Sequence, residues 1–195
     1  MSLDSEVGTT MLASVGAKPR SVLPPLPSRD WKPVRFSDLT SARVLAYGDH
    51  PITRRRPRGS TPAQKSGLRY QRRVCEQLRL LARGGEILVG PWVEYNVGLR
   101  RGYCQPDGIV HHRDLTFVFE IKLSTTTDAW WQLRHLYGPV CEFLFPKQRI
   151  VLVNVVKSHY PETRFPEDTW TFEIGLEGLF EKSSRERIIQ WRPGG

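Results

Sequence analysis

Hydrophobic and polar positions alternate most regularly in one stretch near the middle of the chain, and this alternation predicts a β-hairpin. Residues 105–110 are expected to form its first strand, 111–114 its turn and 115–122 its return strand. Since successive side chains of a strand point to opposite faces, Glu120 and Lys122 share one face of the return strand. The odd-numbered hydrophobic residues share the other face. The pattern therefore sets an acid and an amine side by side.

The register expected for this hairpin brings a second acid to the same face. The four-residue turn pairs Val110 with Leu115. In that register Asp107 lies diagonal to Glu120, with about 7–8 Å between their backbones. Two carboxylates at this spacing can share one divalent cation through oxygen–metal bonds of roughly 2.0–2.1 Å. With the ammonium group of Lys122 beside them to position a water, they are suited to metal-assisted hydrolysis.

Helical periodicity on both sides of the hairpin predicts two helices. Over residues 67–82 the hydrophobic side chains share one helical face and the arginines the other, and Gln71 lies on the inward face. A second helix is expected over 129–137, after a run of Ser and Thr that can cap it, and a Gly-Pro pair at 138–139 should kink or split it. The nearly continuous β-branched run 149–157 predicts a strand buried on both faces.

A further strand is expected over residues 86–95, bent or placed at a sheet edge by an internal Gly-Pro pair. Its Glu94 either reaches the two acids as a third carboxylate or stays in water. The turn that follows carries Arg100 and Arg101, which either hold a phosphate at the mouth of the site or are solvated. The element order is then αβββαβ, and the expected fold class is α/β, a mixed sheet flanked by helices.

The Pro-Asp pair that ends at Asp107, followed by Glu120-Ile121-Lys122, resembles the motif of the PD-(D/E)xK nuclease superfamily, including its RecB-like and phage-type exonucleases and endonucleases. The resemblance covers roughly residues 67–157 and implies a restriction-endonuclease-like core. It also implies that Asp107, Glu120 and the main-chain carbonyl of Ile121 hold one Mg²⁺ or Mn²⁺. Lys122 would then position the attacking water. The alternative is a surface hairpin with a Glu–Lys pair on its solvent face.

The second predicted helix is similar to an element of the RecB-like subset. There a Gln, followed by an apolar residue and later by a Tyr, orients the site and the substrate. Gln132-Leu133 and Tyr137 match this element, with Tyr137 one residue further along. Gln132 is therefore a candidate catalytic residue, and the alternative is an exposed polar residue of a helix. Gln71 stands where relatives often carry a glutamate, and because an amide ligates Mg²⁺ poorly, one metal is expected rather than two.

Residues 1–62 differ in composition from residues 63–195 and are expected to form a Pro-rich, basic N-terminal arm on a nuclease-like domain. Trp31, Val34 and Phe36 can dock this arm on the domain, and residues 37–45 are expected to add one or two helical turns. Four arginines stand within five residues and cannot pack in a core: Arg54, Arg55, Arg56 and Arg58. Each would release counterions on meeting nucleic-acid phosphates. The alternative is a solvated basic linker.

Charge and composition favour a polyanionic partner. The 195 residues include 29 Lys and Arg against 20 Asp and Glu, a net charge of +9 with a pI near 9.8. Nucleic acid is expected as the partner rather than a membrane surface, and no apolar run approaches the ~20 residues of a membrane span. Three separated cysteines indicate neither a disulfide framework nor a zinc site. Since the N-terminus lacks a basic-then-apolar signal, a cytoplasmic or virion-associated protein is expected.

The expected function is metal-dependent hydrolysis of phosphodiester bonds in DNA, in repair, recombination or the processing of mobile-element or phage DNA. Two alternatives remain open. One is a nucleic-acid-binding module that keeps the nuclease fold without its chemistry. The other is a structural or assembly protein, such as a phage particle component, in which the N-terminal arm builds a homo-oligomer or a larger assembly.

Overall fold

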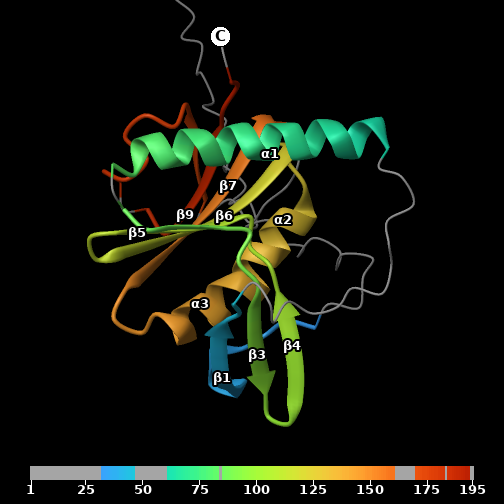
Figure 1. The fold of residues 1–195 in the computed structure, drawn as a ribbon, viewed down its shortest axis with the longest axis vertical. Helices are drawn as coiled ribbons and strands as arrows, with labels where there is room; N and C mark the ends of the chain where they lie inside the picture. The colour runs from blue at the N-terminus through green and yellow to red at the C-terminus, as the bar shows by residue number, and fades with distance from the viewer. Residues whose placement is uncertain (1–31, 47–60, 84, 161–169, 183, 194–195) are drawn as a thin grey trace, which may run out of the picture.

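The computed structural model describes residues 32–46, 61–83, 85–160, 170–182 and 184–193 (Figure 1). These residues form two sheets and a small set of helices. The strands are β1 (Leu39–Val44), β2 (Ile87–Val89), β3 (Val93–Val97), β4 (Arg100–Cys104), β5 (Gly108–His112), β6 (Leu115–Ser124), β7 (Arg149–Ser158), β8 (Trp170–Ile174) and β9 (Glu186–Gln190). The helical elements are the 3-10 turn η1 (Phe36–Asp38), α1 (Pro62–Leu81), α2 (Thr127–Gln132), the π-helical turn η3 (Leu133–Tyr137) and α3 (Gly138–Leu144).

The predicted α/β class with a mixed sheet is confirmed. The large sheet has the strand order β2-β5-β6-β7-β9-β8, and the small antiparallel sheet has the order β1-β3-β4. Strands β2, β5 and β6 are antiparallel neighbours, whereas β6 and β7 run parallel and are connected through α2, η3 and α3. From α1 to β7 the chain therefore follows the expected order of helix, three strands, helix and strand, with the β3–β4 hairpin inserted between β2 and β5.

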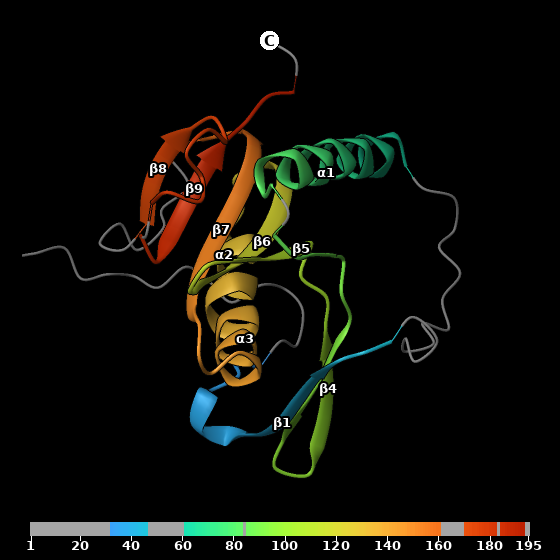
Figure 2. The same cartoon turned by 60° about the vertical axis from the view of Figure 1, so that its left-hand side comes forward.

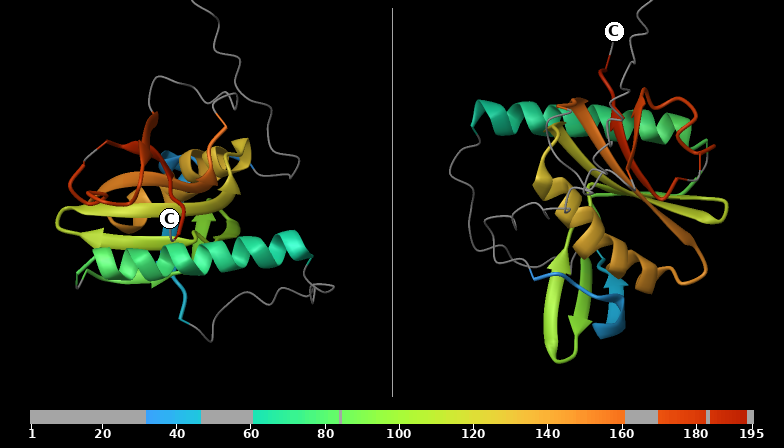
Figure 3. Two further views of the ribbon diagram at one scale, coloured as in Figure 1. Left: turned by 90° about the horizontal axis from the view of Figure 1, so that it is seen from above. Right: turned by 180° about the vertical axis from the view of Figure 1, so that it is seen from behind.

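Helices cover the two faces of the large sheet and build separate hydrophobic clusters there. On one face Val74 of α1 packs in the same cluster as Phe117 of β6. On the other face Leu133 of η3 packs in the same cluster as Val118 of β6. Seen from above, α1 and the α2–α3 helices lie on opposite sides of the sheet (Figure 3). Each fully buried large side chain contributes roughly 1.5–3 kcal/mol through apolar burial, so β6 is held from both sides.

The small sheet packs on the far side of α3. Helix α3 contacts β7 of the large sheet and β1 of the small sheet and lies between them (Figure 2). The ring of Phe36, just before β1, lies 5.9 Å from the ring of Phe143 in α3. The small sheet and α1 consequently occupy opposite ends of the described structure (Figure 1).

Helix α1 begins at Pro62 and not at residue 67 as predicted. The side chain of Thr61 accepts the N–H of Gln64, and the side chain of Gln64 accepts the N–H of Thr61, so the helix starts with a capping box. Pro62 occupies the first helical position, where its missing N–H costs nothing. The first buried side chain of α1 is Tyr70. Hydrophobic periodicity therefore could not reveal the first turn, whereas the Thr-x-x-Gln pattern could have done so.

The β5–β6 hairpin has a different register from the predicted one. His112 pairs with Leu115 across a two-residue turn. Val110 therefore lies opposite Phe117. The turn is made possible by Arg113, whose φ of 57° lies in the left-handed region. The prediction of a four-residue turn is wrong, because His111 and His112 belong to β5 and pair with residues of β6. The pairing moves by two residues, and since side chains alternate with a period of two, the residues of the ladder keep their predicted faces.

The helix expected over residues 37–45 is wrong. Phe36–Asp38 form a single 3-10 turn, and Leu39–Val44 form β1, which pairs antiparallel with β3. The open edge of β3 supplies backbone partners that the local sequence does not encode, and such tertiary pairing overrides weak local propensity. The docking expected of Val34 is confirmed, because its side chain is buried and its N–H donates to the carbonyl of His135 at 2.8 Å. Phe36 contacts Phe143 of α3 but stays 52% exposed, and Trp31 lies outside the described residues.

The strand expected over residues 86–95 is in fact two strands in different sheets. Gly90, with a φ of 56°, separates β2 at the edge of the large sheet from β3 in the small sheet. Arg100 and Arg101 were expected in a turn but lie in β4, because the β3–β4 turn ends at residue 99. This hairpin projects from the end of the molecule opposite α1 (Figure 1).

The first 31 residues of the predicted arm lie outside the described residues, and so do Arg54, Arg55, Arg56 and Arg58. Among the helices in the described ranges, none is long and apolar enough to cross a membrane.

Candidate active site

Asp107 is held by four hydrogen bonds just before β5. Its N–H donates to the carbonyl of Phe119 and its carbonyl accepts the N–H of Gly90, both at 3.0 Å. In the side chain, Oδ2 accepts the N–H of Ile121 and Oδ1 accepts from Nε2 of Gln71, both at 2.7 Å. The Asp107 carboxylate thus accepts a backbone N–H of β6, as a main-chain carbonyl would in a regular ladder. The side chain of Gln71 in α1 holds the same carboxylate from a second direction. The inward position predicted for Gln71 is confirmed.

Asp107 does not take the diagonal ladder position that the sequence predicts. Phe119 already pairs with Gly108, and it also accepts the N–H of Asp107, so two residues on one strand meet a single residue on the other. This arrangement is a β-bulge, which bends a strand and re-aims its side chains. The bulge aims the carboxylate of Asp107 at the backbone of Ile121, beside Glu120.

Glu120 and Lys122 share one face of β6, as the alternation predicts. Nζ of Lys122 lies 2.5 Å from Oε1 of Glu120. The Glu120 side chain is 3% exposed, whereas that of Lys122 is 34% exposed. The ion pair is therefore buried at its acidic end and open to solvent at its basic end.

The electrostatics of this group follow from two acids sharing one ammonium ion. Burial, and after it the nearby charge of Asp107, raise the pKa of Glu120 to about 7 against the opposing effect of Lys122. Burial also raises the pKa of Asp107, although the N–H of Ile121 and the Lys122 charge lower it. Burial lowers the pKa of Lys122, but Glu120 and, after it, Asp107 and Asp128 outweigh this effect and raise the pKa. A second positive charge would allow both acids to ionise.

Gln132 and Tyr137 join the group from the helical side. Nε2 of Gln132 donates to the hydroxyl of Tyr137 at 3.1 Å, and that hydroxyl lies 3.3 Å from the carbonyl of Gln105. A hydrogen bond between Tyr137 and Glu120 lowers the pKa of Glu120. Burial, followed by the charge of Glu120, raises the pKa of Tyr137, so its phenol stays protonated. The pair therefore links the buried acid to the chain just before Asp107.

The contact between Gln132 and Tyr137 depends on the π-helical turn. In an α-helix of 3.6 residues per turn, residues five apart differ by about 140° and cannot face each other. Here the N–H of Gly138 donates to the carbonyl of Leu133, which widens the turn by one residue. Pro139 has no N–H to offer the preceding turn, and the carbonyl of His135 instead accepts the N–H of Val34. The chain stays helical through Gly138 and Pro139, so a widened turn just before this pair stands in place of the predicted kink or split.

The donor set suits a hard divalent cation. Carboxylate and carbonyl oxygens are the ligands of Mg²⁺ and Mn²⁺, and Mg²⁺ commonly uses one or two carboxylates and keeps several waters. Asp107, Glu120 and the carbonyl of Ile121 would supply such a set. Burial raises the pKa of both acids, and at Glu120 the charge of Asp107 adds to this effect. Within the described ranges, no three His, Cys, Asp or Glu side chains gather into a metal centre. The candidate set therefore depends on two acids and on main-chain oxygen.

The structure places the other candidate residues elsewhere. Glu94 does not act as a third acid at this site, because its carboxylate lies 3.2 Å from Nε of Arg43 and 3.8 Å from Nε of Arg101 on the small sheet. Arg101 thus already has an acidic partner. Arg100 lies in the same projecting hairpin.

Sequence reasoning missed one residue of the site, Asn154. This residue pairs with Glu120 across β6 and β7, and it is fully buried. Its signal was available, since it is the one polar residue inside the apolar run from Ile150 to Val156. A polar residue in the middle of a strand buried on both faces needs a partner or a function.

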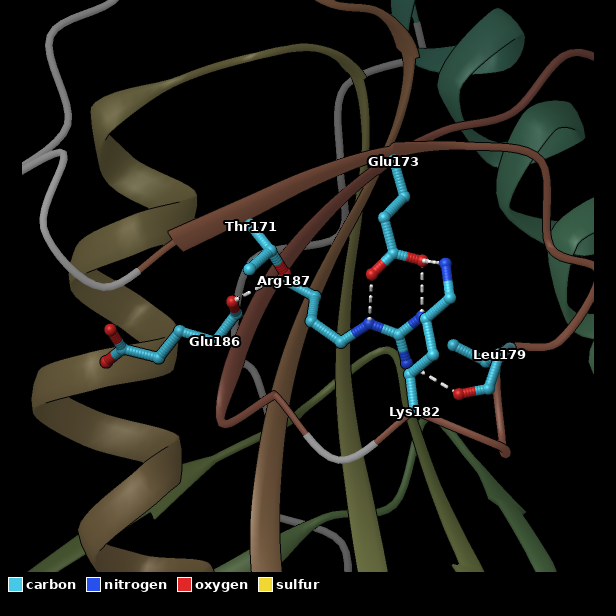
Figure 4. Close-up of polar contacts among 6 residues, drawn as sticks. All are labelled: Thr171, Glu173, Leu179, Lys182, Glu186 and Arg187. Atoms are coloured by element: carbon cyan, nitrogen blue, oxygen red, sulfur yellow. Dashed lines mark hydrogen bonds and ion pairs between the residues drawn. The ribbon is translucent and has the colours of Figure 1, made fainter.

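A second buried charge cluster serves the fold and not the site. Arg187 of β9 is fully buried, and its Nε and Nη2 donate to the two carboxylate oxygens of Glu173 at 2.8 and 2.7 Å (Figure 4). Its Nη1 donates to the carbonyl of Leu179 at 2.5 Å, and Nζ of Lys182 donates to Glu173 at 3.0 Å. This bidentate pair ties β8, β9 and the segment between them together.

Comparison of the chain with models of protein families, with curated proteins and with solved structures gave no match.

Proposed function

We propose that this protein is a metal-dependent nuclease of the PD-(D/E)xK type that hydrolyses phosphodiester bonds in DNA. The observation that carries the proposal is the convergence of Asp107, Glu120 and Lys122 in one network, with both acids raised in pKa. Pairs of acids with perturbed pKa values beside a basic group are characteristic of catalytic sites.

Each residue of the network has a specific role in this proposal. Asp107, Glu120 and the carbonyl of Ile121 hold one Mg²⁺ or Mn²⁺. The bound cation supplies positive charge to the phosphodiester oxygens as they become more negative. Lys122 stays protonated at neutral pH because its pKa is raised. Its ammonium group therefore positions the attacking water by hydrogen bonding and does not take its proton.

Gln132 and Tyr137 support the RecB-like relationship specifically. The chain has one residue more between them than the related element, and the π-helical turn accommodates it and restores their contact. Short π-helical turns inside α-helices are frequent at functional sites. Gln132 orients Tyr137, and Tyr137 orients Glu120.

A basic helix face beside the site supports a nucleic-acid substrate. The exposed cationic residues of α1 are Lys65, Arg69, Arg72, Arg73 and Arg79. Arg72, Arg79 and Gln71 line a cleft of about 260 Å³ between α1 and β2, and Gln71 also contacts Asp107. These positive side chains, which lie beside the two acids, would bind the phosphate backbone of a nucleic acid without recognising its base sequence.

The biological setting that fits this chemistry is DNA repair, recombination or the processing of mobile-element or phage DNA, with the protein in the cytoplasm or in a virus particle. The second candidate function is a nucleic-acid-binding module on the same fold. It is favoured by Gln71, which places a neutral amide against Asp107 where a further acid would strengthen metal binding.

The test is cleavage of plasmid, linear DNA and RNA with Mg²⁺ or Mn²⁺ by the wild type and by Glu120→Gln. Loss of one ligand removes several kcal/mol of charge stabilisation, so the rate should fall about 10³-fold or more. Glu86→Gln, which changes an exposed glutamate next to β2, is the matched control and should cleave normally. A wild type that cleaves none of these substrates would leave the binding module as the better explanation.

A further inference from the structure

Asn154 combines complete burial with an unpaired side chain. It is 0% exposed, and neither Oδ1 nor Nδ2 has a hydrogen-bond partner in the described structure. Its neighbours along β7, Val153 and Val155, are buried as well. Burying an amide without a partner costs free energy, so such a group is retained where water, an ion or a reaction step satisfies it.

The position of Asn154 points to that partner. Asn154 of β7 pairs with Glu120 of β6, and paired residues of neighbouring strands lie on the same face about 4.7–4.9 Å apart. On its other side Asn154 pairs with Ile188 of β9, which offers no polar side chain. Trp130 packs on Ile188 and Val156, and its buried Nε1 also has no partner. Glu120 is therefore the charged acceptor next to the amide of Asn154.

The present arrangement explains why the amide is unpaired. The carboxylate of Glu120 is already engaged by Nζ of Lys122 at 2.5 Å and by Tyr137. A divalent cation held by Asp107 and Glu120 replaces Lys122 as the positive partner of that carboxylate. The carboxylate then needs a further hydrogen bond to fix its orientation, and carboxylates that ligate metals are commonly held in this way.

We propose that Asn154 is a positioning residue for Glu120, whose amide donates to the carboxylate, directly or through one buried water shared with Trp130, when the cation is bound. This inference rests on the proposed function, because it requires that Glu120 bind a metal. It explains why an otherwise apolar strand retains an amide next to the buried acid.

The experiment measures Mn²⁺ affinity of the full-length chain without nucleic acid, by electron paramagnetic resonance of free Mn²⁺, together with urea unfolding of the metal-free protein. Asn154→Leu has a similar volume and no polar atoms. It should leave metal-free stability unchanged or higher, because an unpaired amide is removed, and should weaken Mn²⁺ binding about 10–100-fold. Asn154→Ser keeps a hydrogen-bond donor and should bind more tightly than Asn154→Leu.

Val156→Ala is the control, since Val156 is buried on the same face of the same strand. It should lower stability and leave the Mn²⁺ affinity unchanged, which separates packing from positioning. Wild-type Mn²⁺ affinity in both Asn154 variants would overturn the inference and leave the proposed function standing. A wild type that does not bind Mn²⁺ would overturn both.

Discussion

Ionisation of Glu120 should destabilise the metal-free protein as the pH rises. The pKa of this acid is raised from 4.5 to about 7 in the folded protein, mainly by burial and then by Asp107. Between these two values the folded state holds a proton that the unfolded state has lost, so stability falls with increasing pH. This destabilisation by Glu120 is absent well below pH 4.5 and reaches its full size above pH 7.

The size of this effect follows from the shift. Linkage between the two pKa values gives a loss of about 2–3 kcal/mol between pH 5 and pH 8. Glu120→Gln removes the titration, so the difference in unfolding free energy between variant and wild type should move by about this amount in favour of the variant. The ion pair with Lys122 is lost as well, but Lys122 is charged throughout this range and adds a constant offset.

Urea unfolding in EDTA at pH 5 and pH 8 measures the effect, with Glu86→Gln as the exposed control. Saturating Mg²⁺ should reduce the pH dependence of the wild type, because the cation lets both acids ionise, and should leave Glu120→Gln unchanged. Equal pH dependence of wild type and Glu120→Gln would refute the idea that Glu120 carries a costly buried charge.

Three further expectations concern the surroundings of the site. Tyr137→Phe removes the hydroxyl that accepts from Gln132, so stability in urea should fall by about 1–2 kcal/mol and cleavage should slow; normal cleavage would exclude an orienting role. Glu173→Ala leaves Arg187 buried without its acidic partner, so the free energy of unfolding should fall by about 3–5 kcal/mol. The Mn²⁺ affinity should not change, and an altered affinity would show that this cluster acts on the site. Replacing Arg72 and Arg79 together by Ala should reduce the salt dependence of DNA binding by about two counterions; an unchanged slope would place the nucleic acid elsewhere.

Much of the fold could be predicted from the sequence, because the hydrophobic patterns of helices and strands are local. Alternation in residues 115–122 determined which side of β6 carries Glu120 and Lys122, and this result survived a two-residue error in register because the side-chain period is two. The apolar stripe of α1 placed Gln71 inward, and the contact with Asp107 follows from that. The Gly-Pro pair at 138–139 marked where the second helix changes.

Contacts between segments that are distant in the sequence could not be predicted from such local patterns. β1 forms by pairing with the edge of β3, which lies far along the chain from it. The bulge at Asp107 and the widened turn at Tyr137 each depend on partners far along the chain, Phe119 in one case and Val34 in the other. The pairing of Asn154 with Glu120 depends on the parallel alignment of β6 and β7.

The sequence by itself determined which side chains share a face, which helix faces turn inward and that two acids and an amine lie near one another. The tertiary structure decided how the acids are aimed, which residues surround them and where Asn154 lies. The physical reason is that helix and strand periods are set by the local backbone. Register and burial are set by packing between segments, whose free energy depends on the whole fold.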